Sequence, residues 1–361
     1  MEKLLDGVAV EFKRLGDVVR IKNGKDHKSL GDGAFPVYGS GGVMRYADTY
    51  AYNRPSVLIP RKGSLGNLFF VDVPFWNVDT IFYTEIDEAQ ILPKFLYYFL
   101  TTVGLGEMNQ AGGVPSQTQS VLNELKIPLP CPENSKESLE IQAEIVRILD
   151  VFTALTTELT TELTARKKQY NYYRDQLLSF EEGAVEWKTL EQVYKFQYGM
   201  GNTIPTSGGE YPVYGSNGIV GTHNEFNSED SPVIGHIGAY AGIVNWGAGK
   251  HFVTYNGVIC KLVNELVHPK YAYYQLLKQD FNSMAKSASH PFVSYDALNK
   301  VSIPIPPPAE QERIVAILDK FDALTSSITE GLPREIELRQ KQYEYYRDLL
   351  LSFPKSEKVA A

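Results

Sequence analysis

The sequence predicts an α+β protein in which two α/β domains with small curved sheets are separated by two long helices packed as an antiparallel coiled coil. Three observations support this fold class: the 361-residue chain is written twice, each half opens with short strand-like runs, and each half ends in a long amphipathic stretch. We expect the first α/β domain at 1–135 and the first long helix at 136–183. The second α/β domain is expected at 184–308, the second long helix at 309–353 and a flexible tail at 354–361.

The order of these segments follows from an internal pseudo-twofold duplication. Residues 36–40 (PVYGS) return at 212–216, and residues 166–180 match 339–353 at 12 of 15 positions. The helical ends therefore match closely, while the α/β segments keep only short anchors. We infer that the helices meet a common partner and that the α/β segments meet different ones. A duplicated scaffold without a shared function is the alternative interpretation.

Each α/β domain is predicted from runs of β-branched and aromatic residues bounded by Gly, Pro and Asn. The expected strands are 17–21, 56–59, 68–73 and 80–85 in the first domain, and 192–197, 232–234, 242–246 and 257–263 in the second. A short helix is expected in each domain, at 93–102 and 269–279.

The long helices are predicted from apolar residues spaced by threes and fours, which is the pattern of a coiled-coil seam. Pro333, in Gly331-Leu332-Pro333, predicts a kink or break in the second helix because proline removes a backbone donor. We assign the seam and the docking of partners to Ile145, Ile148, Phe152, Leu159, Tyr170, Tyr173, Ile314, Ile317, Phe321, Tyr343 and Tyr346.

A tandem four-residue repeat, TELT-TELT, occupies 157–164 within the first long helix. It is either ordinary helical sequence or a spacer. One unit more or less would change the helix length by about 6 Å.

Several loops combine glycine with basic or amide side chains, which suits contact with a nucleic acid. Residues 38–42 pair with 214–218, and 61–67 pair with 237–243, so that Arg61 corresponds to Ile237. Ordinary turns are the alternative interpretation of each loop taken alone. The candidate DNA contacts are Arg61, Lys62, Ser64, Asn67, Tyr38, Ser40, Gln117 and Gln119 in the first domain, and Tyr214, Ser216, Asn217, His236, Tyr240, His290 and Ser294 in the second.

The formal net charge of −8 argues against DNA binding through a simple basic surface. Residues 1–135 hold 13 basic and 15 acidic side chains, and residues 184–308 hold 8 and 9, so both domains are near neutral. We therefore expect the isolated chain to bind DNA weakly. The two cysteines, Cys131 and Cys260, lack metal-ligand spacing, and no signal peptide or membrane span is evident, so a cytoplasmic location is expected.

The repeated motifs resemble those of type I restriction–modification specificity subunits. They are a Pro-rich turn, the helix start Gln-x-x-Ile-Val-x-Ile-Leu-Asp-x-Phe, and the helix end Arg-x-Lys-Gln-Tyr-x-Tyr-Tyr-Arg-Asp-x-Leu-Leu-Ser-Phe. The resemblance covers nearly the whole chain. It implies that each α/β domain is a target-recognition domain reading half of a bipartite double-stranded DNA site. It also implies that the helices set the spacing and dock two methyltransferase subunits, which motor–nuclease subunits join.

The same resemblance implies that this chain is not an enzyme and holds no cofactor or metal. S-adenosylmethionine, ATP and Mg²⁺ are expected on the partner subunits. The sequence agrees, since we find no methyltransferase Pro-Pro motif, no Walker motif and no metal-spaced His/Cys set. A free-standing bipartite DNA-binding regulator is the alternative function, and a secreted carbohydrate-binding stalk protein is disfavoured by the absence of a secretion signal.

Overall fold

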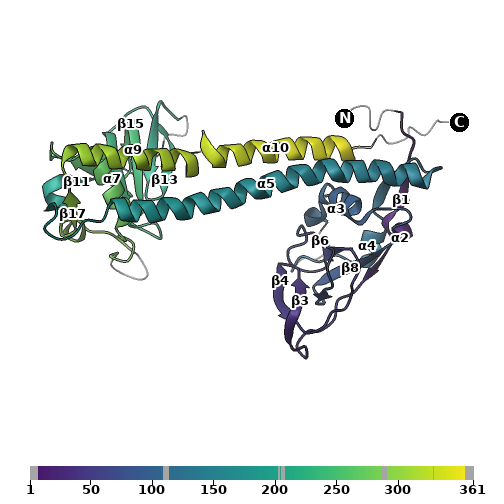
Figure 1. Cartoon of the computed structure of the whole chain (residues 1–361). Helices are drawn as coiled ribbons and strands as arrows, with labels where there is room; N and C mark the ends of the chain where they lie inside the picture. Colours follow the sequence, from purple (N-terminus) through teal and green to yellow (C-terminus); the bar gives the residue numbers. More distant parts are fainter. Residues whose placement is uncertain are drawn as a thin grey trace. The chain divides into compact units, whose positions relative to one another are not determined.

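A computed structural model describes residues 7–108, 114–201, 204, 208–285, 291–327 and 329–353. The chain forms two compact units, and each is described by itself. Unit 1 comprises residues 1–159 and 336–361, and unit 2 comprises residues 160–335. Each unit holds one mixed domain and parts of two long helices (Figure 1). The α+β class predicted from the sequence is confirmed.

Unit 1 is built on a four-stranded sheet in the order β2-β8-β5-β6, in which neighbouring strands run antiparallel. A three-stranded sheet, β4-β3-β7, and the two-stranded ribbon β1-β9 complete the domain. The strands are β1 Val10–Arg14, β2 Val19–Lys22, β3 Asp32–Gly39, β4 Gly42–Ala47, β5 Ser56–Pro60, β6 Phe69–Val71, β7 Trp76–Asn77, β8 Ile81–Ile86 and β9 Lys126–Pro130.

Unit 2 repeats this wiring in a six-stranded sheet, β11-β16-β14-β15-β12-β13, with a ribbon β10-β17. The hairpin β12-β13 joins the sheet through a parallel pairing of β12 with β15, as β3 pairs parallel with β7 in unit 1. The strands are β10 Glu186–Thr189, β11 Tyr194–Tyr198, β12 Tyr211–Gly215, β13 Gly218–His223, β14 Ser228–Gly235, β15 Val244–Val253, β16 Gly257–Leu262 and β17 Ser302–Ile305.

The strand predictions are wrong mainly next to short helices and at hairpin turns. Residues 17–21 and 192–197 were expected to be strands throughout, but each run begins in a short helix, α2 (Leu15–Val18) or α6 (Leu190–Val193). The sequence predicts loops at 38–42 and 214–218, where the structure has the ends of the hairpins β3-β4 and β12-β13. Each hairpin turns at a glycine with positive φ, Gly42 or Gly218. The sequence pattern does not reveal that these glycines allow the flanking residues to pair as strands.

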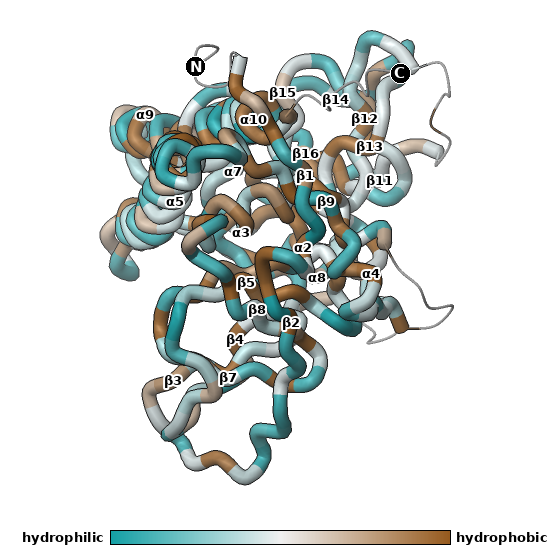
Figure 2. The backbone as a smooth tube through the Cα atoms, turned by 90° about the vertical axis from the view of Figure 1, so that its right-hand side faces the viewer, coloured by the Kyte–Doolittle hydropathy of each residue, from teal (hydrophilic) through white to brown (hydrophobic). Residues whose placement is uncertain are grey.

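The short helices lie where they were expected. Helix α3 spans Pro93–Thr101 and α7 spans Pro269–Lys278, each with proline in its first turn. Figure 2 shows the apolar course of α3 and of β5, which form the centre of the unit 1 core. Two further helices precede the second ribbon strands, α4 (Gln119–Asn123) and α8 (Tyr295–Asn299), and a 3-10 turn covers Leu105–Glu107.

The first long helix is continuous and the second is broken. Helix α5 covers Ser135–Leu177, whereas α9 (Pro308–Thr325) and α10 (Gly331–Leu351) are separate helices. Pro333 lies in the first turn of α10, where its missing N–H costs nothing. Gly331 has φ +75°, and a Cβ there would lie 2.3 Å from the Ala323 carbonyl oxygen. The predicted break is thus confirmed, with glycine at the turn.

A glutamine and an aspartate fasten the start of α5 to the domain of unit 1. The buried Gln142 accepts a hydrogen bond from Leu92 N (2.8 Å) and donates to Gln90 O (3.0 Å), just before α3. Eight residues later, Asp150 accepts from Tyr98 Oη (2.6 Å). These contacts explain why both polar residues belong to the repeated helix start.

Unit 2 makes the same attachment with the second copy of the motif. Gln311 accepts from His268 N (2.7 Å) and donates to Leu266 O (3.0 Å), just before α7. Asp319 accepts from Tyr274 Oη (2.5 Å). Proximity to the Asp319 carboxylate adds to burial in raising the pKa of Tyr274, so this hydroxyl stays a donor.

The near-identical helix ends also have a packing role. In unit 1 the end of α10 places Leu350, Leu351 and Phe353 in the core, where the Phe353 ring meets Phe95. In unit 2 the end of α5 places Leu178 in a cluster with Tyr271 of α7. Each unit is therefore completed by the helix end of the other sequence repeat.

The seam residues pair antiparallel helices within each unit. Phe152 stacks on Tyr346 in unit 1 (5.2 Å between centroids), and Phe321 stacks on Tyr173 in unit 2 (5.9 Å). Ile145 and Ile314 are fully buried, and Tyr173 keeps 42% of its surface exposed. The other seam residues are half-buried, namely Ile148, Leu159, Tyr170, Ile317 and Tyr343.

Candidate nucleic-acid interface

Three segments meet at one end of the unit 1 sheet. They are the β3-β4 turn, the loop 61–67 that follows β5, and the segment 114–118 that precedes α4. Asn67 Nδ2 donates to Ser40 O (3.2 Å), which ties the first two together. Gly63 N donates to Pro115 O (2.8 Å), which ties the second to the third. These hydrogen bonds hold the three segments together, and we call the assembly the loop frame.

The predicted unit 1 residues divide into exposed and inward-facing groups. Lys62, Ser64 and Asn67 are exposed, and Arg61, Ser40 and Gln119 are half-buried. The Arg61 guanidinium lies over the Phe82 ring at 5.9 Å, which restrains its position.

Two predicted contacts in unit 1 face the interior. Gln117 is 2% exposed and donates to Pro60 O (2.6 Å), so its amide holds the loop frame. Tyr38 packs its ring against Phe69 and Phe75, and burial raises the pKa of its hydroxyl. Gln117 is therefore buried, which corrects the expectation that it lines the surface, whereas Tyr38 is half-buried like Ser40 and Arg61.

Unit 2 builds the same backbone frame from a different sequence. His236 N donates to Asn256 O (2.8 Å) as Arg61 N donates to Thr80 O (2.8 Å). Val293 N donates to His236 O (3.0 Å) as Gln117 N donates to Arg61 O (3.0 Å). The structure therefore pairs Arg61 with His236, not with Ile237, and the alignment expected from the sequence was shifted by one residue at this point.

Of the predicted unit 2 contacts, Asn217 and Tyr240 are exposed and Ser216 is half-buried. Ser294 caps α8, since its Oγ accepts from Ala297 N (3.3 Å). Tyr214 is buried and its hydroxyl donates to Trp246 O (3.1 Å), so the expectation of a surface tyrosine is corrected. His290 lies outside the described residues.

His236 is 6% exposed, and its Nδ1 donates to Val293 O (3.1 Å), because a carbonyl only accepts. Burial lowers the pKa of this imidazole, so the ring is neutral at physiological pH. A neutral imidazole with a protonated Nδ1 has Nε2 as an acceptor.

Sequence reasoning missed the positions that surround this frame. Asn23 in unit 1 and Tyr198 in unit 2 each precede a glycine that no larger residue could replace. A Cβ at Gly24 would lie 2.0 Å from Val78 O, and one at Gly199 would lie 2.1 Å from Thr254 O. The matched glycines were the signal that could have located this edge in both halves.

A hollow of about 440 Å³ lies behind the unit 1 loop. The residues Gly66, Asn67, Phe69, Tyr97 and Gly106 contribute to its wall. It thus lies between the loop 61–67 and helix α3 with the turn that follows α3.

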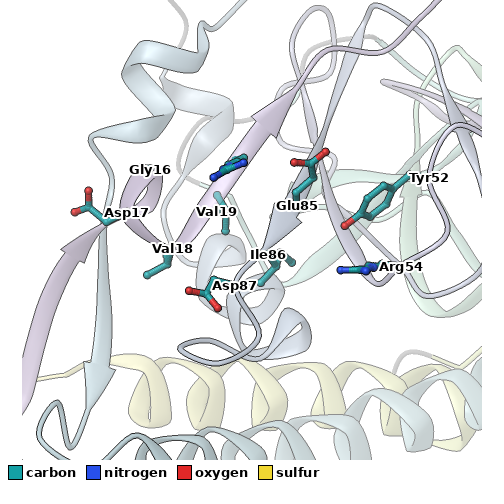
Figure 3. Close-up of a pocket in the computed structure, with 10 residues that line it drawn as sticks. Gly16, Asp17, Val18, Val19, Tyr52, Arg54, Glu85, Ile86 and Asp87 are labelled. Atoms are coloured by element: carbon teal, nitrogen blue, oxygen red, sulfur yellow. The ribbon is translucent and has the colours of Figure 1, made fainter.

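A second hollow, of about 670 Å³, lies at the other end of β8 (Figure 3). Tyr52 and Arg54 lie side by side at one end of it and Asp17 lies at the other. Glu85 and Asp87 add two carboxylates to the lining. Arg20 also lines the hollow, so three carboxylates face two arginines and no surplus of positive charge is left for a phosphate.

The residues that the structure describes contain neither a metal-binding cluster nor a membrane-spanning helix. No group of three or more His, Cys, Asp or Glu side chains is arranged there to hold a metal ion. Within the same residues, no helix is both long and apolar enough to cross a membrane.

Comparison with known proteins matches both repeats. The family model described as "Type I restriction modification DNA specificity domain" matches residues 8–167 and 184–338. The chain is 38% identical to the Escherichia coli "Type I restriction enzyme EcoR124I/EcoR124II specificity subunit", over 100% of this chain and 98% of that one. It is 34% identical to a putative type I restriction enzyme specificity subunit of Haemophilus influenzae, over 98% of both chains.

Solved structures share the fold. The crystal structure of a type I restriction–modification S subunit from M. genitalium aligns with a TM-score of 0.68 at 18% identity, over 98% of both chains. A structure from a study of assembly and conformational transition of the type I R-M system aligns with a TM-score of 0.56 at 14% identity, over 95% of this chain and 97% of that one. With two matched domains and full-length relatives, this chain belongs to the family of type I restriction–modification DNA specificity subunits.

Proposed function

We propose that this chain selects the DNA sequence on which a type I restriction–modification complex acts, with each unit reading one half of a bipartite site. The observation that carries the proposal is the loop frame built twice with the same backbone hydrogen bonds and different outward side chains. Family membership supports a specificity role over a free-standing regulator.

We propose further that α5 sets the distance between the half-sites. Support comes from its continuity, since α5 runs unbroken from residues of unit 1 into residues of unit 2. At 1.5 Å per residue, its 43 residues measure about 65 Å. The TELT repeat at 157–164 lies inside it, and deleting one copy should shorten the spacer between the half-sites without changing their bases.

Docking of two methyltransferase subunits is proposed at the duplicated helix ends. Tyr172 and Tyr345 occupy the same position in the two copies, and both are strongly exposed at 62% and 64%. Their neighbours Tyr173 and Tyr346 face the helix seam. An exposed tyrosine at the same position of both repeats suits two copies of one partner, because equivalent surfaces can bind identical subunits.

Methyl transfer, ATP hydrolysis and cleavage are assigned to the partner subunits, together with S-adenosylmethionine, ATP and Mg²⁺. The test measures adenine methylation on a random-sequence DNA library by the chain alone, by the methyltransferase alone and by the two together. Methylation at one bipartite sequence should require both. Methylation by this chain alone would overturn the non-catalytic role, and unchanged methylation without the chain would overturn the specificity role.

The proposal also includes weak DNA binding by the isolated chain at physiological salt, because both domains are near neutral. Binding isotherms with and without the methyltransferase would test it. Equal, tight affinity in both experiments would contradict this part.

A further inference from the structure

The duplicated frame allows the outward residues of the two units to be compared position by position. Strand β2 pairs with β8 in the register that β11 keeps with β16, and β5 pairs with β8 as β14 pairs with β16. Lys25 N donates to Asn77 O as Met200 N donates to Val253 O. These registers define four equivalent pairs, Asn23 with Tyr198, Arg61 with His236, Asp79 with Tyr255, and Gln119 with Tyr295.

The unit 1 members, which we name the polar quartet, are joined by hydrogen bonds. Gln119 Nε2 donates to Asn23 Oδ1 (3.3 Å), and Arg61 Nη1 lies 3.5 Å from Asp79 O. Asn23 and Asp79 are exposed. Among the described residues, no donor bonds to the Asp79 carboxylate, so both its oxygens can accept from a ligand.

The unit 2 members, which we name the aromatic quartet, are joined by ring contacts instead. Tyr198 stacks on Tyr295 at 4.2 Å and lies 4.3 Å from the His236 ring. Tyr255 meets His236 edge-on at 5.5 Å. The positions that hydrogen-bond in unit 1, 23 with 119, are the ones that stack in unit 2.

The aromatic quartet continues into an open apolar surface. Tyr255 is 45% exposed, and Met200 and Phe292 on the neighbouring segments are 58% and 37% exposed. Burial raises the pKa of Tyr295 to about 12, so its hydroxyl remains protonated. An exposed apolar cluster at a functional surface marks a contact site for an apolar group.

The arginine content also differs between the two domains. Residues 1–135 contain five arginines, and residues 184–308 contain none. Arginine provides the common bidentate contact to guanine O6 and N7, whereas apolar side chains contact the C5 methyl group of thymine. The second domain therefore cannot read guanine with an arginine fork of its own.

We propose that the two quartets are the base-reading positions of the two units and that they read different chemistry. The polar quartet selects a G·C pair, with the Arg61 fork on guanine and the Asp79 carboxylate on the cytosine amino group. The aromatic quartet selects thymine by apolar contact with its C5 methyl group. This inference rests on the proposed function, because it names the bases that the two domains would read.

The test removes one atom or group from the DNA at a time. The full-length chain, in complex with its methyltransferase subunits, selects binding sites from random duplexes made with natural bases, with deoxyuridine replacing thymidine, or with 7-deazaguanine replacing guanine. Deoxyuridine lacks only the methyl group, and 7-deazaguanine lacks the N7 acceptor. Loss of one buried methyl contact corresponds to about a 4-fold loss of preference, and loss of half of a guanine fork to roughly 10-fold.

Variants assign each half-site to its unit. Tyr255→Asp installs the unit 1 residue and should abolish the thymine preference in one half-site, while Tyr255→Phe keeps the ring and should restore it. Arg61→His installs the unit 2 residue and should abolish the guanine preference in the other half-site, with Arg61→Lys recovering part of it. Phe226→Ala is the matched control, since this exposed aromatic residue lies at the opposite end of β14.

The expected result is that the deoxyuridine library degrades only the half-site altered by Tyr255→Asp. The 7-deazaguanine library should degrade only the half-site altered by Arg61→His. Recovery of both half-sites unchanged from the deoxyuridine library, or loss of the same half-site in both libraries, would overturn the inference. Failure of the natural library to yield any bipartite motif would instead sink the proposed function itself.

Discussion

Replacing Gln142 by methionine should detach the start of α5 from the unit 1 domain. The side chain is fully buried and bonds Leu92 N and Gln90 O at 2.8 and 3.0 Å. Methionine has nearly the same length but neither accepts from the amide nor donates to the carbonyl. Each buried group left without a partner costs about 1–3 kcal/mol. Two such groups give about 3 kcal/mol once partial burial at Leu92 is considered.

Hydrogen exchange at the Leu92 amide measures this loss directly, because exchange reports the free energy of local opening. A loss of about 3 kcal/mol corresponds to a rise in the exchange rate of roughly 100-fold. The same substitution at Gln311 should act on the His268 amide in unit 2. Gln340→Met, at an exposed position of α10, is the control.

Exchange at Leu92 within threefold of the parent rate would refute this reasoning. It would mean that the domain holds the segment before α3 without the glutamine. A similar increase in Gln340→Met would instead show that methionine on the helices is harmful wherever it is placed.

Three further predictions concern stability and assembly. His251 is fully buried with its pKa lowered by burial, so the unfolded chain takes up a proton near pH 6.5 and the folded chain only at lower pH. As the pH drops below 6.5, the free energy of unfolding should therefore decrease by up to about 1.4 kcal/mol per pH unit. Urea titrations at several pH values should show a weaker decrease for His251→Phe than for the parent chain. The same decrease in both proteins would contradict this prediction. Gly331→Ala and Gly183→Ala should each lower the free energy of unfolding by at least about 1 kcal/mol, because both glycines have positive φ. Gly331→Ala should lower it further, because only there would the added Cβ lie 2.3 Å from a carbonyl oxygen, that of Ala323. Equal thermal midpoints would argue against the steric cause. Tyr172→Ala combined with Tyr345→Ala should weaken methyltransferase binding at least 10-fold in calorimetry while leaving the melting temperature unchanged, and undiminished binding would place the docking surface elsewhere.

The duplication and the helices were predictable because their signals are periodic. Apolar spacing by threes and fours located α5 and the second long helix, and Gly331-Leu332-Pro333 located the break. The hairpins were not predictable, because β3 and β12 carry Gly and Pro that are also typical of loops. Their pairing depends on Gly42 and Gly218, and on partners more than 30 residues away in β7 and β15.

The sequence marked polar loops but not the direction in which their side chains point. A pattern of Gly, Ser and Gln marks a polar loop, yet it does not distinguish Gln117, which points into the domain, from Ser64, which points out. Tyr214 was misplaced for the same reason. The repeated helix start was attributed to a shared partner, whereas Gln142 and Asp150 also have partners within their own unit.

The helix end that completes unit 1 has a consequence for biosynthesis. Leu350, Leu351 and Phe353 leave the ribosome among the last residues, although the core they enter begins with Leu15. Unit 2, which ends at residue 335, can close earlier. The domain translated first should therefore mature last, and a nascent chain halted before residue 350 should expose Phe95 and Ile145 to chaperones or aggregation.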